Sequence, residues 1–351
     1  MDEIICGDAL EEMRKLPANS INLIYTDPPY FKVKGEAWDH QWENPAKFLE
    51  WVGELCQEWQ RILKPNGSLY VFASPRMAAR VECKIGEYFN VLNNIRWVKD
   101  AGWHNKNDKE ELRSYLSPWE ACIFAEHFGS DNIAKGEAGY GAKCDELRGF
   151  IFEPIRAYLD GEKDRSGFTT RQVAEAFQKK TGSRTVTGMA GHWFTSVQWT
   201  LPTEDNYRWL KELLNSNGSD DFLKREYDDL KREYDDLRRP FSVTPDVPYT
   251  DVWDFPTVQY YEGKHPCEKP IEMHRHVISA SSRPGDVVLD CFGGSCVVAD
   301  ACIQLDRRYI IIEQDAEYVS QARKRVLSIN PEIARRRVAA TTTRLDRWST
   351  P

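Results

Sequence analysis

The sequence predicts an α/β protein with a mostly parallel sheet that is covered by helices on both faces. Short apolar runs alternate with amphipathic helical stretches over roughly the first 130 residues, and this alternation is typical of parallel sheets. The same alternation returns from about Asp251. Between Gly129 and Thr250, strand-like runs are rare and Gly, Asp, Lys and Thr are frequent. The change indicates an inserted segment of different architecture.

Composition excludes several other classes of protein. The chain has 351 residues, of which 41% are hydrophobic and 29% charged, so it is neither disordered nor fibrous. No apolar run approaches the roughly 18 residues of a membrane span, and the N-terminal segment is not a signal peptide. The nine cysteines include no C-x-x-C pair, so we expect reduced thiols in a cytoplasm and no zinc or other metal site. A net charge of −8 does not by itself favour nucleic-acid binding, although it can hide a basic face.

The elements of the first α/β region follow from apolar runs and turn residues. The segment Lys64-Pro65-Asn66-Gly67 is expected to end a long amphipathic helix, because proline and glycine interrupt helices. Buried strands are predicted where β-branched and aromatic residues cluster, and helices where apolar residues recur every three or four positions. The predicted strands are residues 4–6, 21–25, 68–73 and 91–98, and the predicted helices are 9–15, 45–63 and 77–88.

The second α/β region contains the same kinds of signal. A helix is expected from Lys269 to about Ser281, followed by a turn at Arg283-Pro284-Gly285. The remaining predicted elements are a strand at 287–290, a helix ending near 305, a strand at 309–312 and a helix at 316–328. The last residues, 331–351, form a basic tail, which either frays or contacts DNA.

The insert contains an outline of a helix-turn-helix motif. Phe168-Thr169-Thr170 opens a helix from Arg171 to Lys180, a glycine turn follows, and a second helix is expected from about 187 to 194. The alternative is a small helical subdomain with solvated lysines. Residues 165–200 carry five positive charges and one negative, a local balance of +4. Four of the five positive residues are predicted to bind DNA: Arg171, Lys179, Lys180 and Arg184. The fifth is Arg165.

A seven-residue duplication ends the insert. The sequence Leu-Lys-Arg-Glu-Tyr-Asp-Asp occurs at 223–229 and again at 230–236. Its apolar residues lie four and three positions apart, which predicts a helix with a heptad stripe. Two and a half heptads are marginal for a free coiled coil, so packing against its own subdomain is favoured over a dimer zipper.

The first motif with chemical potential is Asp27-Pro28-Pro29-Tyr30, directly after a predicted buried strand. Consecutive prolines remove N–H donors and fix the backbone, and a residue before proline is held extended. The corner therefore presents acceptors, the Asp27 carboxylate and the Pro28 carbonyl, beside one aromatic ring. A planar exocyclic amine would find both hydrogens accepted there. The alternative is an ordinary turn with a solvated aspartate, but the position after a buried strand of an α/β chain favours the functional interpretation.

The second motif is a strand, a glycine turn and a helix. The turn Cys291-Phe292-Gly293-Gly294-Ser295-Cys296 follows Asp290, and Glu313 ends the next strand. Glycines permit close backbone approach, and the helix N-terminus that follows is a favourable place for a polar ligand. An acid at the end of the next strand grips ribose hydroxyls in dinucleotide folds. Because G-x-G-x-x-G is absent, the turn indicates an adenosine ligand without a pyrophosphate.

Together these segments resemble the amino-methyltransferases that act on exocyclic nitrogens of DNA bases, in their permuted β-class arrangement. The resemblance covers roughly residues 4–128 and 253–328 and includes His265-Pro266-Cys267-Glu268-Lys269-Pro270, which is similar to the family's H-P-x-x-K-P segment. It implies a Rossmann-like S-adenosylmethionine-dependent methyltransferase fold, circularly permuted, with an inserted mostly helical target-recognition domain. The implied parts are a catalytic half (1–128), the insert (129–250), a cofactor-binding half (251–330) and the basic tail (331–351).

The resemblance also assigns site residues. Asp27, Pro28, Pro29 and Tyr30 would be catalytic. Two residues depart from the family's usual turn: Cys291 stands where a proline is common and Cys296 where a glycine is common, which bears on contacts to the methionine end of the cofactor. Asp8 could accept from the cofactor's adenine amine, cap the helix that follows, or do both. The residues implied to bind S-adenosylmethionine are Asp8, His265, Lys269, Asp290, Phe292, Gly293, Gly294, Ser295 and Glu313.

The implied reaction is methyl transfer to an adenine N6 amine in double-stranded DNA. The base must flip out of the duplex, and Tyr30 would stack on it. The loop 31–42, with Lys32 and Lys34, would close over the base and phosphates, although it could equally be plain surface. The segment 97–117 resembles a second loop near the DNA, but for this segment plain surface is the favoured interpretation. Cys267 is interpreted as structural, because no covalent intermediate is required.

Several alternatives remain at this point. The same fold methylates cytosine N4, although that chemistry more often has S-P-P-Y in this family, so Asp27 favours adenine. A non-catalytic DNA-binding protein with a methyltransferase shell is disfavoured by the intact motifs, and methylation of protein glutamine is disfavoured by Asp27 and the basic insert. A restriction endonuclease partner and a homodimer are further options, and the expected location is the cytoplasm of a bacterial or phage-infected cell.

Overall fold

A computed structural model describes most of the chain, with side chains. For residues 140–151 it describes the helical backbone alone. The described residues are 2–33, 40–99, 110, 112–128, 140–184, 186, 188–195, 199–216, 218, 221–243, 249–261 and 264–329. The predictions for Lys34, for residues 100–109 of the second loop and for the basic tail lie outside them.

The chain forms two compact units. One comprises Met1–His127 and Pro240–Pro351, and the other comprises Phe128–Arg239. The second unit thus begins one residue before the predicted insert, and it ends at Arg239, whereas the predicted insert extends to Thr250. That the second unit recognises the target sequence stays a prediction.

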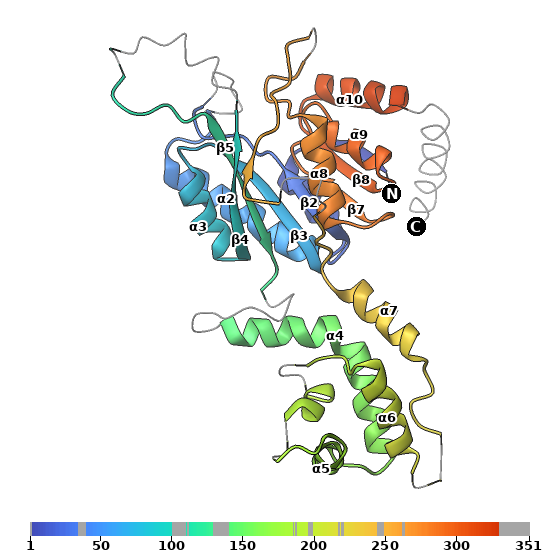
Figure 1. Cartoon of the computed structure of the whole chain (residues 1–351). Helices are drawn as coiled ribbons and strands as arrows, with labels where there is room; N and C mark the ends of the chain where they lie inside the picture. The colour runs from blue at the N-terminus through green and yellow to red at the C-terminus, as the bar shows by residue number, and fades with distance from the viewer. Residues whose placement is uncertain are drawn as a thin grey trace. The chain divides into compact units, whose positions relative to one another are not determined.

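The described part of the first unit contains an eight-stranded sheet with the order β1-β8-β7-β2-β3-β5-β4-β6 (Figure 1). Only β5 runs antiparallel to its neighbours, β3 and β4. The predicted mostly parallel sheet is confirmed, whereas β5 and β6 were not predicted. The strands are β1 (Glu3–Cys6), β2 (Ile21–Thr26), β3 (Leu63–Ala73), β4 (Asn90–Val98), β5 (Trp119–Glu126), β6 (Val252–Trp253), β7 (Val287–Asp290) and β8 (Arg308–Glu313).

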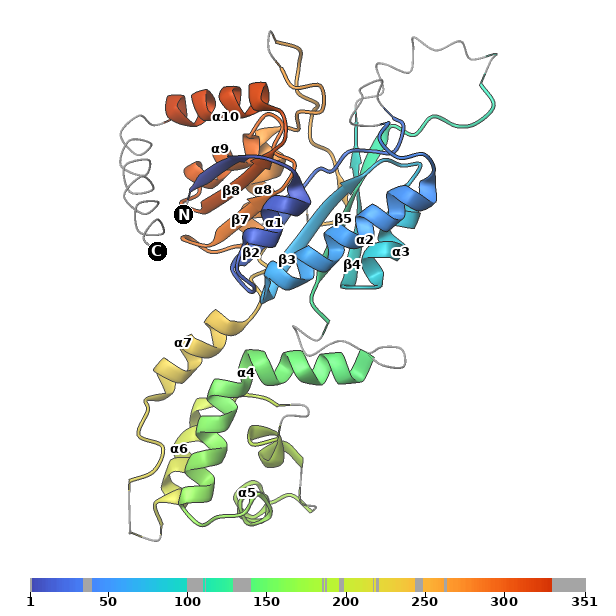
Figure 2. The same ribbon diagram turned by 180° about the vertical axis from the view of Figure 1, so that it is seen from behind.

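Helices cover both faces of this sheet. The apolar sides of α1, α2 and α3 form one core with one face, and those of α8, α9 and α10 form a second core with the other face (Figure 2). Because strand residues alternate in direction, every strand except the two-residue β6 contributes to both cores. The helices are α1 (Ala9–Lys15), α2 (Pro45–Ile62), α3 (Ala78–Gly86), α8 (Ile271–Ser281), α9 (Val297–Gln304) and α10 (Ala316–Ile329).

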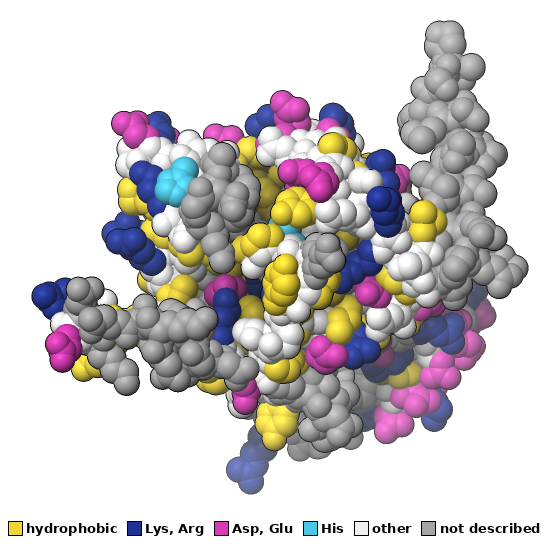
Figure 3. Space-filling model, turned by 90° about the horizontal axis from the view of Figure 1, so that it is seen from above, with side chains coloured by type: hydrophobic (Ala, Val, Ile, Leu, Met, Phe, Trp, Pro, Cys, Tyr) yellow, Lys and Arg dark blue, Asp and Glu magenta, His cyan; other side chains and the backbone are white. Residues whose placement is uncertain are grey.

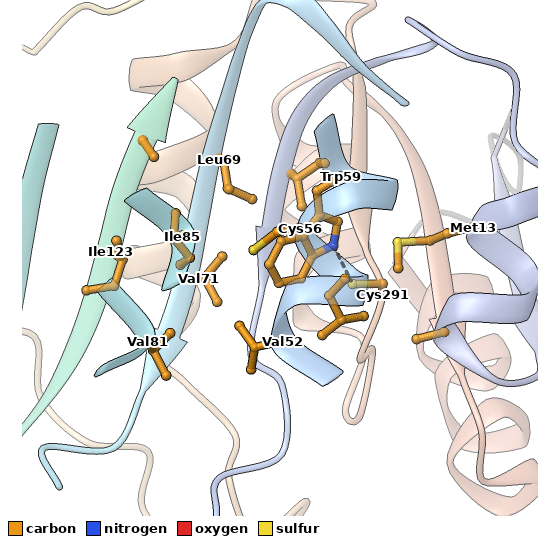
Figure 4. Close-up of a cluster of buried hydrophobic side chains, with 14 of the residues drawn as sticks. Met13, Val52, Cys56, Trp59, Leu69, Val71, Val81, Ile85, Ile123 and Cys291 are labelled. Atoms are coloured by element: carbon orange, nitrogen blue, oxygen red, sulfur yellow. Dashed lines mark hydrogen bonds between the residues drawn. The ribbon is translucent and has the colours of Figure 1, made fainter. Parts of the chain in front are cut away.

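Helix α2 shows how the local sequence determines this packing. Asn44 caps its N-terminus by accepting from the Lys47 N–H at 3.1 Å, and Pro45 occupies the first turn, where a missing N–H costs nothing. Its apolar side chains recur every three or four residues and point into the core. Among them, fully buried Trp59 donates its indole N–H to the Cys291 sulfur at 3.4 Å (Figure 4). This contact ties α2 to the residue that directly follows β7.

The segment between α2 and β3 differs from the prediction. Helix α2 does end at Ile62, but residues 64–67 belong to β3 and do not form a separate turn. The register of β3 against β2 is irregular between Ile21 and Leu23, which accommodates the extra residues. A β-carbon on Gly67 would lie 2.5 Å from the Leu63 side chain and 2.9 Å from the Asn22 carbonyl oxygen. Glycine is therefore required for the close approach of the two strands.

The second unit is helical in its described part. Its core is formed by apolar side chains of four α-helices and one 3-10 helix. The predicted helix at 171–180 is α5, with a capping box at Thr169 and a left-handed Gly182 at its C-terminus. The elements are α4 (Tyr140–Arg165), α5 (Thr170–Thr181), a 3-10 helix (Gly188–Trp193), α6 (Glu204–Leu214) and α7 (Tyr227–Leu237).

The helix-turn-helix prediction was wrong in its second helix. Residues 188–193 form a short 3-10 helix containing two glycines, which are poor α-helix formers. Its Trp193 is buried in the core of the unit, 1% exposed, with its ring against Phe177 of α5. The element therefore stabilises the unit's core and does not present a recognition helix.

The heptad stripe packs within its own unit, as the sequence favoured. Leu223 and Leu230 are fully buried in the core of the second unit, and Tyr227, Tyr234 and Leu237 pack against it. The helix is shorter than the duplication, because α7 begins only at Tyr227 and Leu223 adopts a left-handed backbone with φ +53°. The first copy of the repeat is therefore mostly outside the helix.

Candidate active site

The two motifs leave neighbouring strands at one edge of the sheet. Strands β2 and β7 are parallel and paired, with Leu23 opposite Val288 and Ile24 opposite Leu289. The Asp27 corner follows β2, and the glycine turn follows β7. Both loops therefore leave the carboxyl edge of the sheet from adjacent central strands. In α/β sheets this edge is where ligands bind.

The Asp27 carboxylate is held by two donors. One oxygen accepts from the Tyr30 hydroxyl at 2.7 Å, and the other accepts from the Lys269 ammonium. The Asp27 side chain is 23% exposed, so it remains accessible from solvent. Behind the corner, Pro28 and Pro29 line a small apolar cavity. The predicted rigid corner therefore has its carboxylate fixed in direction by Tyr30 and Lys269.

Lys269 lies at the Asp27 corner. Its side chain is only 4% exposed, and its ammonium lies 4.1 Å from the centre of the Phe72 ring. It pairs with Asp27 and, at 3.5 Å, with Glu120 at the start of β5. Lys269 is predicted to bind the cofactor, and in the structure its ion-pair partners are these two carboxylates.

Glu120 contacts three polar side chains. Its Oε2 accepts from the Tyr30 hydroxyl at 3.1 Å and faces Lys269, while its Oε1 accepts from Lys99. Tyr30 has one hydroxyl proton, so it can donate to Asp27 or to Glu120 at any moment. The result is a network of two carboxylates, two ammonium groups and one phenol around the Asp27 corner.

The network shifts the pKa of several members. Burial alone would raise the pKa of Glu120, but the Lys269 and Lys99 ammonium groups hold it below its usual value. Burial opposes the charged form of Lys269, yet Asp27 and Glu120 raise its pKa above the usual value. Burial and then the charges of Asp27 and Glu120 raise the pKa of Tyr30 well above that of a free phenol. The lysine and Glu120 are therefore charged, and the tyrosine is a neutral donor.

The glycine turn is fixed by Asp290 and by β8. Asp290 is 5% exposed, and its Oδ1 accepts from the Thr26 hydroxyl at 2.8 Å and from the Phe292 N–H at 3.1 Å. Burial raises the pKa of Asp290 to about 7. A β-carbon on Gly293 would overlap the Ile311 side chain, so the turn can lie against β8 only because this residue is glycine. Asp290 thus joins the glycine turn to the end of β2.

Glu313 and His265 flank the same turn. Glu313 accepts from the Gly294 N–H through one oxygen and from the Asp315 N–H through the other, each at 2.8 Å. The His265 ring covers Gly294, because a β-carbon there would lie 3.1 to 3.3 Å from it. Gly294 also has φ +45°, which favours glycine. Glu313, His265 and Gly294 thus lie together at the turn, and their binding of the cofactor stays a prediction.

Asp8 and Ser295 are two further residues predicted to bind the cofactor. Asp8 follows β1, the neighbour of β8, and it caps α1 by accepting from the Glu11 N–H at 3.1 Å. The capping alternative is therefore observed, and a contact to an adenine amine stays a prediction. Ser295 is held through its carbonyl oxygen, which accepts from Arg325 at 2.5 Å.

The residues at the turn fit S-adenosylmethionine. The main chain at Gly293 and Gly294 carries no side chain, and a carboxylate, Glu313, stands beside it with only two of its roughly four acceptor positions used. Cys296, before α9, offers no side-chain cap to the helix N-terminus. Cys296 itself adopts φ +60°, a conformation that costs a cysteine about 1–2 kcal/mol relative to glycine.

The predicted DNA contacts have different surroundings. Lys32 is exposed, and its ammonium donates to the Glu43 carbonyl at 3.0 Å. In the second unit, Arg171 is 87% exposed and pairs with Glu175, and Lys180 donates to Asn206 at 2.9 Å. Lys179 and Arg184 are exposed as well. On the face seen in Figure 3, Lys, Arg, Asp and Glu side chains are interspersed.

Sequence reasoning missed Glu120 and Lys99. The run from Ala121 to Ala125 is apolar and alternates between the two cores, so it could have been recognised as a strand. Because β5 is antiparallel, its first residues lie at the same edge as the last residues of β2 and β3. An acidic residue at the start of this strand was the available signal.

The described residues contain neither a membrane-spanning helix nor a cluster of metal ligands. No helix there is long and apolar enough to cross a membrane. Among the same residues, no group of three or more His, Cys, Asp or Glu side chains is arranged to hold a metal ion.

Comparisons with known proteins agree with this geometry. The model of a family described as "DNA methylase" matches residues 21–324. The chain is 26% identical to the DNA adenine methyltransferase YhdJ of Escherichia coli (92% of this chain, 82% of that protein) and 23% identical to the type II methyltransferase M.HpaI of Haemophilus parainfluenzae (93% and 74%).

Solved structures share the fold. TTHA0409 from Thermus thermophilus is similar with a TM-score of 0.50 at 18% identity, over 94% of this chain and 97% of that one. PvuII DNA methyltransferase, a cytosine-N4-specific protein, is similar with a TM-score of 0.50 at 13% identity, over 95% and 93%. At these identities the likeness concerns the fold alone.

Proposed function

This chain belongs to the N6/N4 family of DNA methylases, and from that premise we propose that it methylates the N6 amine of a flipped-out adenine in double-stranded DNA. The observation that carries the proposal is the Asp27 carboxylate, which projects from the end of β2 next to the glycine turn of β7. The relatives YhdJ, named a DNA adenine methyltransferase, and M.HpaI, a type II methyltransferase, support it.

S-adenosylmethionine supplies the methyl group as an electrophilic sulfonium. We propose that Glu313 grips its ribose hydroxyls, that the Gly293-Gly294 main chain lies against it, and that His265 closes one side. Asp290 is buried and holds the turn, so its role is to position the loop. The cofactor's methyl group would then face the Asp27 corner across the pair of strands.

The target amine is a weak nucleophile, because its lone pair is delocalised into the base. Acceptors at Asp27 and the Pro28 carbonyl would favour localisation of the lone pair on nitrogen as it attacks, which is a preorganised electrostatic effect. Alignment of the amine with the methyl group would supply much of the remaining rate enhancement. Tyr30 would stack on the base, with its hydroxyl held by Asp27.

Membership of the family also supports proposals about target recognition, cellular location and partners. We propose that the second unit recognises the target sequence, through exposed residues such as Arg171 and Arg184, and that the enzyme acts in the cytoplasm of a bacterial or phage-infected cell. A restriction endonuclease partner and a homodimer remain predictions of the same proposal. M.HpaI, by name a type II methyltransferase, supports the first of these.

One experiment tests the target atom. The protein is incubated with duplex DNA and S-adenosylmethionine labelled in its methyl group, and the DNA is digested to nucleosides. We expect labelled N6-methyladenine. Labelled N4-methylcytosine instead would contradict the adenine proposal, and the absence of label from every nucleoside, across DNA of varied sequence, would contradict DNA methylation.

A further inference from the structure

The Asp27 corner is surrounded by balanced charges. Asp27 and Glu120 contribute two negative charges, and Lys269 and Lys99 contribute two positive ones. The side chains of Glu120 and Lys269 are 16% and 4% exposed, so solvent screens them little. The cluster is therefore neutral overall, with its charges in a partly buried site.

Methyl transfer moves positive charge toward this cluster. The sulfonium of the cofactor is positive before the reaction, and the amine nitrogen becomes positive as its bond to the methyl group forms and the bond from sulfur breaks. The sulfur is left as a neutral thioether, and the nitrogen then releases one of its two protons to solvent. In the proposed function this nitrogen lies against Asp27. Any surplus positive charge at the corner would oppose the movement, because like charges repel strongly where water is excluded.

Lys269 is such a charge, since its ammonium donates to Asp27 itself. Without Glu120, the positive charge of Lys269 would cancel the negative charge of Asp27 that stabilises the amine nitrogen. Glu120 lies 3.5 Å from the same ammonium, and its second oxygen accepts from Lys99. Glu120 also accepts from the Tyr30 hydroxyl at 3.1 Å, so it contacts both donors that hold Asp27.

We propose that Glu120 is a positioning residue that neutralises Lys269 and draws Tyr30 and Lys269 toward itself, so that Asp27 keeps its negative charge for the target amine. This inference rests on the proposed function, because it takes the amine to lie at Asp27. Glu120 contacts Tyr30 and Lys269 and acts on the reaction through them. Without its charge the cluster would carry one net positive charge.

The test compares wild type with Glu120→Gln, which keeps size and removes the charge. We expect the single-turnover rate of methyl transfer to duplex DNA to fall roughly 10²-fold, similar to the loss of one preorganised stabilising group. The dissociation constants for S-adenosylmethionine and DNA should change less than threefold. A rate within threefold of wild type would overturn the proposal.

Charge balance provides a second, sharper measurement. The double variant Glu120→Gln with Lys99→Met removes one charge of each sign and restores neutrality. We expect it to regain at least tenfold in rate over Glu120→Gln, whereas a purely structural role of Glu120 predicts no recovery. Glu120→Asp, which keeps the carboxylate, should retain most of the wild-type rate. A double variant no faster than the single one would overturn the charge mechanism.

Glu126→Gln is the matched control. Glu126 is buried on the same strand and on the same face as Glu120, at the far end of β5, where it accepts from Asn90 at 3.1 Å. Its variant should transfer methyl groups at close to the wild-type rate. Thermal melting shows whether each variant folds. If Glu120→Gln does not fold, the double variant is compared with Glu120→Asp instead, and a rate of methyl transfer below one tenth of the Glu120→Asp rate overturns the proposal. A wild-type protein without activity would refute the proposed function instead.

Discussion

Replacement of Asp27 by asparagine tests the centre of the proposed mechanism. Asparagine has the same size and keeps a carbonyl oxygen, so the hydrogen bond from the Tyr30 hydroxyl, 2.7 Å in the native structure, can persist. The negative charge is lost, and Lys269 retains only the Glu120 carboxylate, at 3.5 Å. The change therefore removes one charge from the corner without altering its shape.

The structure sets the expected magnitudes. Loss of a charge-assisted hydrogen bond to a buried ammonium costs about 2 kcal/mol of stability, and Glu120 offsets part of it. That cost corresponds to a decrease in melting temperature of roughly 4–8 °C. Loss of a preorganised group that stabilises developing charge lowers the rate about 10² to 10³-fold, or ~2.7–4 kcal/mol. Affinity for the cofactor should change little, because the glycine turn is held by Asp290 and Glu313.

Three measurements on one preparation separate these effects. Rapid-quench assays under single-turnover conditions give the rate of methyl transfer, calorimetry gives the affinity for S-adenosylmethionine, and thermal melting gives stability. Asp286→Asn is the control, because Asp286 lies before β7, at the opposite edge of the sheet, and accepts from the Arg283 N–H at 2.7 Å. A folded Asp27→Asn protein with a rate within threefold of wild type would refute the role of this carboxylate.

Two more predictions concern other parts of the molecule. Burial raises the pKa of Asp290 to about 7 in the folded state, so the contribution of this carboxyl group to stability should fall as pH rises from about 4 to about 7. Asp290→Asn should then stabilise the protein against urea by up to about 4 kcal/mol at pH 8 and little at pH 4, and equal gains at both values would contradict this reasoning. Arg171→Ala with Arg184→Ala should weaken DNA binding and reduce its salt dependence by about 0.9 per lost phosphate contact, measured by fluorescence anisotropy. Arg232→Ala, in the acidic helix α7, is the control and should not change DNA binding. Unchanged affinity of the Arg171→Ala, Arg184→Ala double variant at low salt would contradict the proposed contact of these arginines with DNA.

Local patterns were sufficient for most of the sheet and its helices. The boundaries of α1 and β7 were predicted to the residue, because a capping aspartate and a run of β-branched residues define them locally. The 3-10 helix at 188–193 was mistaken for an α-helix, since its two glycines and the burial of Trp193 outweigh its apolar spacing. Strand β5 was missed although its apolar run is clear.

By itself, the sequence determined that Asp27 and the glycine turn each follow a strand of a parallel sheet, because apolar runs and turn residues act over a few positions. Only the tertiary structure decided which side chains surround Asp27 and the glycine turn. Lys269 belongs to a segment that resembles a cofactor-binding motif, yet it pairs with Asp27, 242 residues away, and with Glu120. The physical reason is that the order and direction of strands bring these side chains to one edge of the sheet, and a local pattern carries no information about which distant strand becomes a neighbour.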